Sequence, residues 1–212
     1  MTATTYPSPI KAHRKADMAV HITGLLLIFG AGGLLLTKAA ANLNPLLISA
    51  TLIYVACALA SNLASWAYHF APWHSARKRL RRIDHAAIYL SISGTFTPFF
   101  IQANTRWSLS LLAICWALTA LAIWKKVTDE NVKSRWSTAS YLGLGAIGLC
   151  AIPDLRDVPA ATLWCILAGA GAYVFGTLFY ARKSMPFRYA IWHQCVTFGA
   201  VFMYAGIWLA LF

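Results

Sequence analysis

Acidic side chains are scarce in this sequence. Only 6 of its 212 residues are Asp or Glu, and all charged residues together make up 11%, whereas a soluble domain carries about 25%. Hydrophobic residues make up 59% of the chain, and the mean hydropathy is +0.60. This balance excludes an ordinary soluble domain and is typical of a protein that crosses a membrane several times.

Because acids are so few, the formal net charge is +12. Such a charge would suit a nucleic-acid partner, but the cations lie in short clusters between apolar runs. Clusters of this kind are typical of membrane topology signals and of contacts with anionic lipid headgroups. We therefore expect no nucleic-acid partner.

Closely spaced cysteines are also lacking. The chain has five cysteines, all within apolar runs and none near another in sequence. This spacing argues against a disulfide framework and against a zinc site built from cysteines.

Alternation of apolar and polar residues, the pattern of a half-buried strand, is absent as well. Instead, long apolar runs recur, each near the 20 residues that a bilayer requires. We predict an all-α integral membrane protein: a bundle of seven helices forming one domain over residues 18–212, behind a basic tail at residues 1–17. We do not expect a cleavable signal peptide. The predicted spans are Met18–Thr37, Leu46–Phe70, Ala86–Ala103, Trp107–Trp124, Trp136–Ile152, Ala160–Tyr180 and Ala190–Phe212.

Lysine and arginine are distributed unevenly between the two sets of loops. Alternate loops and the N-terminal tail hold nearly all of them, which leaves Lys38, Arg106 and Arg156 for the other side. Because cytoplasmic loops carry the excess of these residues, we predict a cytoplasmic N-terminus and a C-terminus outside. The cations on the predicted cytoplasmic side are Lys11, Arg14, Lys15, Arg77, Lys78, Arg79, Arg81, Arg82, Lys125, Lys126, Lys133, Arg135, Arg182, Lys183 and Arg188.

Histidines gather on the same side. The predicted topology brings His69, His85 and His193 to one depth, together with Asp84. Polar residues collect at membrane interfaces in any case, which accounts for His85. His69 and His193 lie within apolar stretches, where ionisable residues usually face the bundle interior and mark function.

Two pairs of residues have the spacing of one helix face. Ser65 precedes His69 by four positions, and Tyr189 precedes His193 by four. Two histidines, a carboxylate and a hydroxyl at one level are the components of a metal site, and zinc prefers imidazole nitrogen. A hydrogen-bonded polar cluster between helices is the alternative. In that case Asp84 caps the third span, and Ser65 bonds back to its own helix.

Three blocks of sequence resemble the hemolysin III branch of the progestin and adipoQ receptor family, within a wider group that includes alkaline ceramidases. They are Ser65-x-x-x-His69, the segment "RRIDHAAIYLSISGTFTPF" (residues 81–99), and "AIWH" (residues 190–193) preceded by "GTLFYARKSMPF" (residues 176–187). The resemblance covers nearly the whole chain. It agrees with seven spans and a cytoplasmic N-terminus, and we expect a bacterial inner membrane protein.

The resemblance implies a zinc ion held by the histidine of the second span and by two histidines of a His-x-x-x-His motif on the seventh. By position, His69 and His193 match ligands, Asp84 matches an acid that orients the water at the metal, and Ser65 matches a serine beside the site. The first histidine of the last motif is missing, because its position holds Tyr189.

A neutral phenol is a poor zinc ligand, so this departure leaves three outcomes open. Asp84 coordinates the metal directly, or His21 or His85 supplies the third nitrogen. Otherwise the site holds no metal, and Tyr189 bonds to Asp84 or His193 in its place.

The function we expect first is zinc-dependent hydrolysis of a lipid amide or ester at the cytoplasmic face. Asp84 would take the proton of the attacking water, and Ser65 would help to hold the substrate carbonyl or its oxyanion. The alternatives are a non-catalytic lipid sensor with a degraded metal site and, less favoured, a pore-forming haemolysin. Anionic lipid headgroups are the expected partners of the run Arg77–Arg82.

Overall fold

The computed structural model describes residues 6–128 and 134–212, although nothing is stated of the side chains at 134–136. Lys133 and the side chains of Arg135 and Trp136, which entered the predictions above, therefore lie outside the described residues. The regular elements are α1 (Lys11–Leu27), a π-helical turn (Ile28–Gly32), α2 (Gly33–Asn42), α3 (Pro45–Phe70), a 3₁₀ turn (His74–Ala76), α4 (Arg77–Ala103), α5 (Arg106–Thr128), α6 (Ser134–Leu149), a second 3₁₀ turn (Ile152–Asp154), α7 (Ala160–Ala181) and α8 (Arg188–Leu211).

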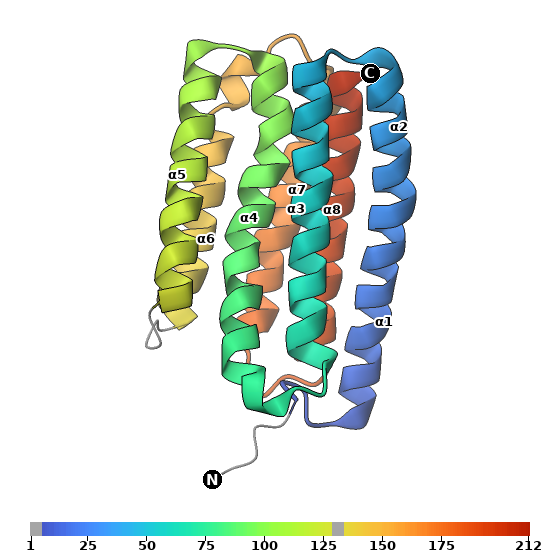
Figure 1. The fold of residues 1–212 in the computed structure, drawn as a ribbon, viewed down its shortest axis with the longest axis vertical. Helices are drawn as coiled ribbons and strands as arrows, with labels where there is room; N and C mark the ends of the chain where they lie inside the picture. The colour runs from blue at the N-terminus through green and yellow to red at the C-terminus, as the bar shows by residue number, and fades with distance from the viewer. Residues whose placement is uncertain (1–5, 129–133) are drawn as a thin grey trace.

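Within the described residues the bundle has seven rods, because α1, the π-helical turn and α2 run on as one helix over residues 11–42. Consecutive rods run in opposite directions, so α1 begins at one end of the bundle and α8 finishes at the other (Figure 1). The predicted all-α fold is confirmed for the described residues, and each of the seven predicted spans coincides with a helix.

Five of these helices are long and apolar enough to cross a membrane: Lys11–Asn42, Pro45–Phe70, Arg106–Thr128, Ala160–Ala181 and Arg188–Leu211. The other two are α4, which begins with a run of arginines, and α6, which has 16 residues. The chain is therefore a helical integral membrane protein.

Two helices begin earlier than the sequence predicted, and both shifts concern acids. Helix α1 begins at Lys11 rather than Met18, which places Asp17 inside the helix. Helix α4 begins at Arg77 rather than Ala86, so Asp84 lies two turns into it. The alternative in which Asp84 caps this helix is therefore wrong.

Local sequence explains several helix ends. Pro45 occupies the first turn of α3, and the side chain of Asn44 caps it by accepting a hydrogen bond of 3.0 Å from the amide of Leu47. Asn104 adopts the left-handed conformation, with φ of 49°, and stops α4. Since α5 begins two residues later, α4 and α5 form a helical hairpin with a short connection.

Glycines allow two helix pairs to pack closely. A Cβ added to Gly94 of α4 would come within 2.6 Å of Cys57 Cβ on α3, and one added to Gly176 of α7 within 2.8 Å of Cys195 Cβ on α8. Small residues at such crossings let membrane helices approach. Helices of these two pairs carry His69, Asp84 and His193, which are described next together with Asp17 of α1.

Candidate metal centre

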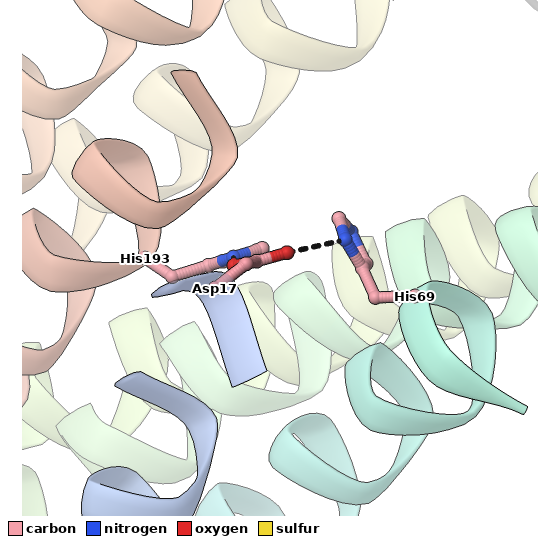
Figure 2. Close-up of side chains that lie close together, drawn as sticks. All are labelled: Asp17, His69 and His193. Carbon is pink, nitrogen blue, oxygen red and sulfur yellow. Dashed lines mark hydrogen bonds and ion pairs between the residues drawn. The ribbon is translucent and has the colours of Figure 1, made fainter. Parts of the chain in front are cut away.

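Three helices bring a carboxylate and two imidazoles together near the end of the bundle where α1 begins. Asp17 of α1 lies between His69 of α3 and His193 of α8 (Figure 2). Asp17 Oδ2 is 2.9 Å from His69 Nδ1, and Asp17 Oδ1 is 2.6 Å from His193 Nδ1. Asp17 and His69 are buried, and the three ligand atoms all lie within 4.8 Å of one another. The predicted proximity of His69 and His193 is confirmed.

Each helix positions its ligand for a local reason. Asp17, His21 and Gly24 are the buried residues of α1, and their spacing of four and three places them on one helix face. His69 lies in the last turn of α3. Helix α8 begins after Phe187, a non-glycine residue in the left-handed region with φ of 54°. The Phe187 ring packs 4.2 Å from that of His13, which ties the start of α8 to α1.

Two atoms of the cluster are buried without a hydrogen bond, namely Asp17 Oδ2 and His69 Nδ1. They face each other at 2.9 Å, so the pair has the distance of a hydrogen bond but not its angles. A cation coordinated by both atoms would compensate for their loss of water. Two histidines and one carboxylate also form a known catalytic zinc set that leaves the fourth position for water. The residues present therefore fit a metal ion.

His21 adjoins the cluster, but both of its ring nitrogens are engaged elsewhere. Nδ1 lies 2.9 Å from the backbone carbonyl oxygen of Asp17, and Nε2 lies 3.0 Å from Ser65 Oγ. A carbonyl oxygen only accepts, so Nδ1 carries the proton, and in the neutral ring Nε2 accepts from Ser65. The neighbouring Asp84 carboxyl group competes for the single hydroxyl proton of Ser65, whose oxygen remains an acceptor.

Asp84, the acid that the sequence singled out, lies beside this cluster. Its carboxyl group is buried, neighbours Ser65, and is within electrostatic range of His193 and Asp17. The cluster of potential ligands found among the described residues contains Asp17 and does not contain Asp84. This position suits a role next to a metal.

Tyr189 lies against the cluster through its ring. The ring centroids of Tyr189 and His69 are 4.9 Å apart in an edge-to-face contact, whereas Tyr189 and His193 are 6.5 Å apart. The tyrosine that replaces the expected histidine thus supports His69 as an aromatic neighbour. His85 is not one of the three clustered residues. Its backbone carbonyl oxygen accepts a hydrogen bond of 2.9 Å from the Tyr141 hydroxyl.

Sequence reasoning missed Asp17, because the predicted tail ended at that residue. One signal was available: Asp17 and His21 repeat the spacing of four seen in Ser65–His69 and Tyr189–His193. Asp17 is also one of only 6 acidic residues in the sequence.

Comparison with known proteins shows the family of this chain. Residues 15–204 match the model of the family described as "Haemolysin-III related". The chain belongs to this family. The matched segment contains Asp17, His69 and His193, so the whole candidate centre lies within the family region. The resemblance drawn from the sequence blocks is confirmed.

Two bacterial proteins illustrate the relationship. The "Hemolysin-3 homolog" of Bacillus subtilis (strain 168) is 31% identical over 191 residues, which cover 89% of this chain and 90% of that protein. "Hemolysin-3" of Bacillus cereus is 29% identical over 193 residues, covering 89% and 87%. The similarity therefore extends over almost the full length of each protein.

Proposed function

We propose that this protein is a metal-dependent hydrolase of lipid amide or ester bonds, with zinc held by Asp17, His69 and His193. The observation that carries the proposal is a buried cluster of one carboxylate and two imidazoles from three helices, in which Asp17 Oδ2 and His69 Nδ1 face each other at 2.9 Å without the geometry of a hydrogen bond. Ionisable groups at such positions are costly in a membrane protein and usually mark function.

The roles of the neighbouring side chains follow from their surroundings. Zinc held there would supply Lewis acidity to a water molecule and to a substrate carbonyl. Asp84, next to the cluster, takes a proton from the attacking water and returns it to the leaving group. The Ser65 hydroxyl is shared between His21 and Asp84. Its oxygen is free to accept a hydrogen bond from a substrate amide or hydroxyl, which is the role we assign to it. This differs from the oxyanion contact expected at first.

The membrane arrangement is part of the proposal. All seven rods cross the bilayer, including α4 and α6, and the end that carries the metal centre faces the cytoplasm. Support comes from the cations, which crowd the ends of α3, α5 and α7 and the starts of α1, α4 and α8, all at this end of the bundle (Figure 1). We place the protein in a bacterial plasma membrane, in keeping with its Bacillus relatives.

Metal analysis and turnover together test this proposal. We expect close to one zinc ion per chain after purification, and hydrolysis of short-chain lipid amides or esters that is lost in Asp84→Asn with the zinc retained. Iron(II) is the control metal, because two histidines and a carboxylate also suit it. Less than about 0.1 metal ion per chain, with no stabilisation on adding zinc, would refute the metal site.

Two other functions are outcomes of the same experiments. Metal binding without turnover of any lipid would support a non-catalytic sensor. The name "Hemolysin-3" of the Bacillus cereus relative suggests haemolysis. Leakage of a dye from liposomes at low protein density would support a pore.

A further inference from the structure

An arginine lies one aromatic ring away from a proposed metal ligand. The Tyr189 ring packs 4.9 Å from that of His69. The guanidinium carbon of Arg188 lies 4.3 Å from the centroid of the same Tyr189 ring. A positive charge is thus held beside the metal centre, and an anion is the kind of ligand that such a charge binds.

Two tyrosines hold the Arg188 side chain in place. Besides stacking on Tyr189, the guanidinium carbon is 5.7 Å from the Tyr180 ring, and Nη1 donates a hydrogen bond of 3.4 Å to the Tyr180 carbonyl oxygen. Among the described residues no carboxylate forms an ion pair with Arg188; the pairs found there all involve Asp17. Its charge is therefore oriented but not neutralised.

Arg81 approaches the same region from α4. It precedes Asp84 by three residues, which places both on one helix face. Arg81 is exposed, and it is within electrostatic range of Tyr68 of α3 and Tyr180 of α7. Tyr180, which contacts Arg188, is thus within electrostatic range of Arg81, and the two arginines lie on the helices that carry Asp84 and His193.

We infer that Arg81 and Arg188 bind the phosphate of a lipid headgroup, so that the centre takes a phosphate-bearing anionic lipid rather than an uncharged one. Guanidinium groups bind phosphate oxygens through paired, charge-assisted hydrogen bonds. In a glycerophospholipid the ester groups lie only a few bonds from the phosphate, so a phosphate at Arg188 brings an ester towards His69. The inference rests on the proposed function, because it assigns a substrate class to that centre.

Other cations near the site are less suited to binding the phosphate. Arg77, which opens the predicted headgroup-binding run, is buried and donates to the carbonyl oxygens of Tyr68 and Ala71 at the end of α3. Arg79 and Arg182 are exposed, and no contact ties them to the tyrosines. They serve as matched controls for the two proposed phosphate ligands.

Lipid binding by the purified full-length protein tests the inference. In an uncharged detergent with a metal chelator present, we would titrate short-chain phosphatidylglycerol, diacylglycerol, ceramide and glycerol phosphate, and follow binding by native mass spectrometry. We expect phosphatidylglycerol to bind at least about 10-fold more tightly than either uncharged lipid. Arg81→Gln and Arg188→Gln should each lose about 10-fold, whereas Arg79→Gln and Arg182→Gln change binding less than about twofold.

Several results would overturn the inference. Equal affinity for phosphatidylglycerol and diacylglycerol would exclude a phosphate site, and equal losses in the control variants would reduce it to diffuse attraction. Glycerol phosphate binding as tightly as the lipid would show a site for free phosphate compounds. Arg188→Lys keeps the charge without the paired donors, so an intermediate loss supports the assignment even if Arg188→Gln folds poorly.

The binding assay is independent of catalysis. Because the metal is removed, the preference for phosphatidylglycerol is measured without any turnover. Lack of turnover therefore refutes the proposed function alone, and loss of the lipid preference in an active protein refutes the phosphate site alone.

Discussion

The two ends of the bundle are built from different chemistry. At the end where α1 begins, the interior holds Asp17, His21, His69 and Asp84, all buried. Towards the other end the interior is an apolar cluster, whose largest fully buried side chains are Phe99, Phe100, Leu35 and Ile207. Both ends belong to the same helices, so the difference is not one of fold.

This contrast separates the residues that stabilise the bundle from the residues that form the candidate metal centre. An apolar interior needs no buried charges in order to pack, whereas a buried polar group costs free energy unless it forms all of its hydrogen bonds. At the site end the bonding is incomplete, since Asp17 Oδ2 and His69 Nδ1 lack hydrogen bonds. We therefore assign the proposed function to the site end and expect the apolar end to provide most of the stability.

Truncating the apolar end should cause the largest loss of stability. Phe99 is 1% exposed, so Phe99→Ala should lower the free energy of unfolding by about 3–5 kcal/mol, through lost burial and a residual cavity. Phe29 is 66% exposed, and Phe29→Ala is the control that should change little. Unfolding in detergent measures both. Zinc stoichiometry should be unchanged in the folded fraction. A loss of zinc from the folded protein would contradict the separation of stability and metal binding between the two ends.

Removing the carboxylate of the site end should instead affect metal binding. We expect Asp17→Asn to weaken zinc affinity by more than about 100-fold, because changes outside the ligand set already cost 10–100-fold. Titration with a zinc-competing chelator measures the change. Asp154→Asn is the control, since Asp154 bonds to Thr105 between α4 and α5. Zinc affinity that survives Asp17→Asn, with His69 and His193 intact, would return Asp84 to the ligand set.

The sequence predicted the helices of this fold well, because long apolar runs directly reflect the bilayer that they cross. His69 and His193 were also predicted, since each stands out within such a run. Asp17 was not, because it lies among polar residues before the first apolar run and gives no contrast with its neighbours. Its contact with His193 joins positions 176 residues apart, and only the packing of α1 against α8 creates that proximity.

Restoring the missing histidine tests whether Asp17 has replaced it. Because Asp17 already supplies a third ligand, Tyr189→His alone should tighten zinc binding by no more than about 10-fold. In the Asp17→Asn background the same change should recover most of the lost affinity if the two positions are interchangeable. The double variant therefore distinguishes replacement from coincidence. No recovery would mean that position 189 cannot reach the metal and that Tyr189 only supports the His69 ring.

The smallest effect is expected for Lys38, a cation held by two aromatic rings at the apolar end. Lys38 Nζ lies 4.2 Å from the Trp208 ring and 4.5 Å from the Phe212 ring, which ties α2 to α8. Lys38→Met keeps the length of the side chain and removes the charge, and we expect a loss of about 0.5–1 kcal/mol in the free energy of unfolding. Lys38→Arg should retain the contact and serves as the control. Zinc affinity should not change in either variant, because this cation joins two helices at the end opposite the metal centre. A change in zinc affinity would show that the α2–α8 contact also sets the position of α1, and hence of Asp17.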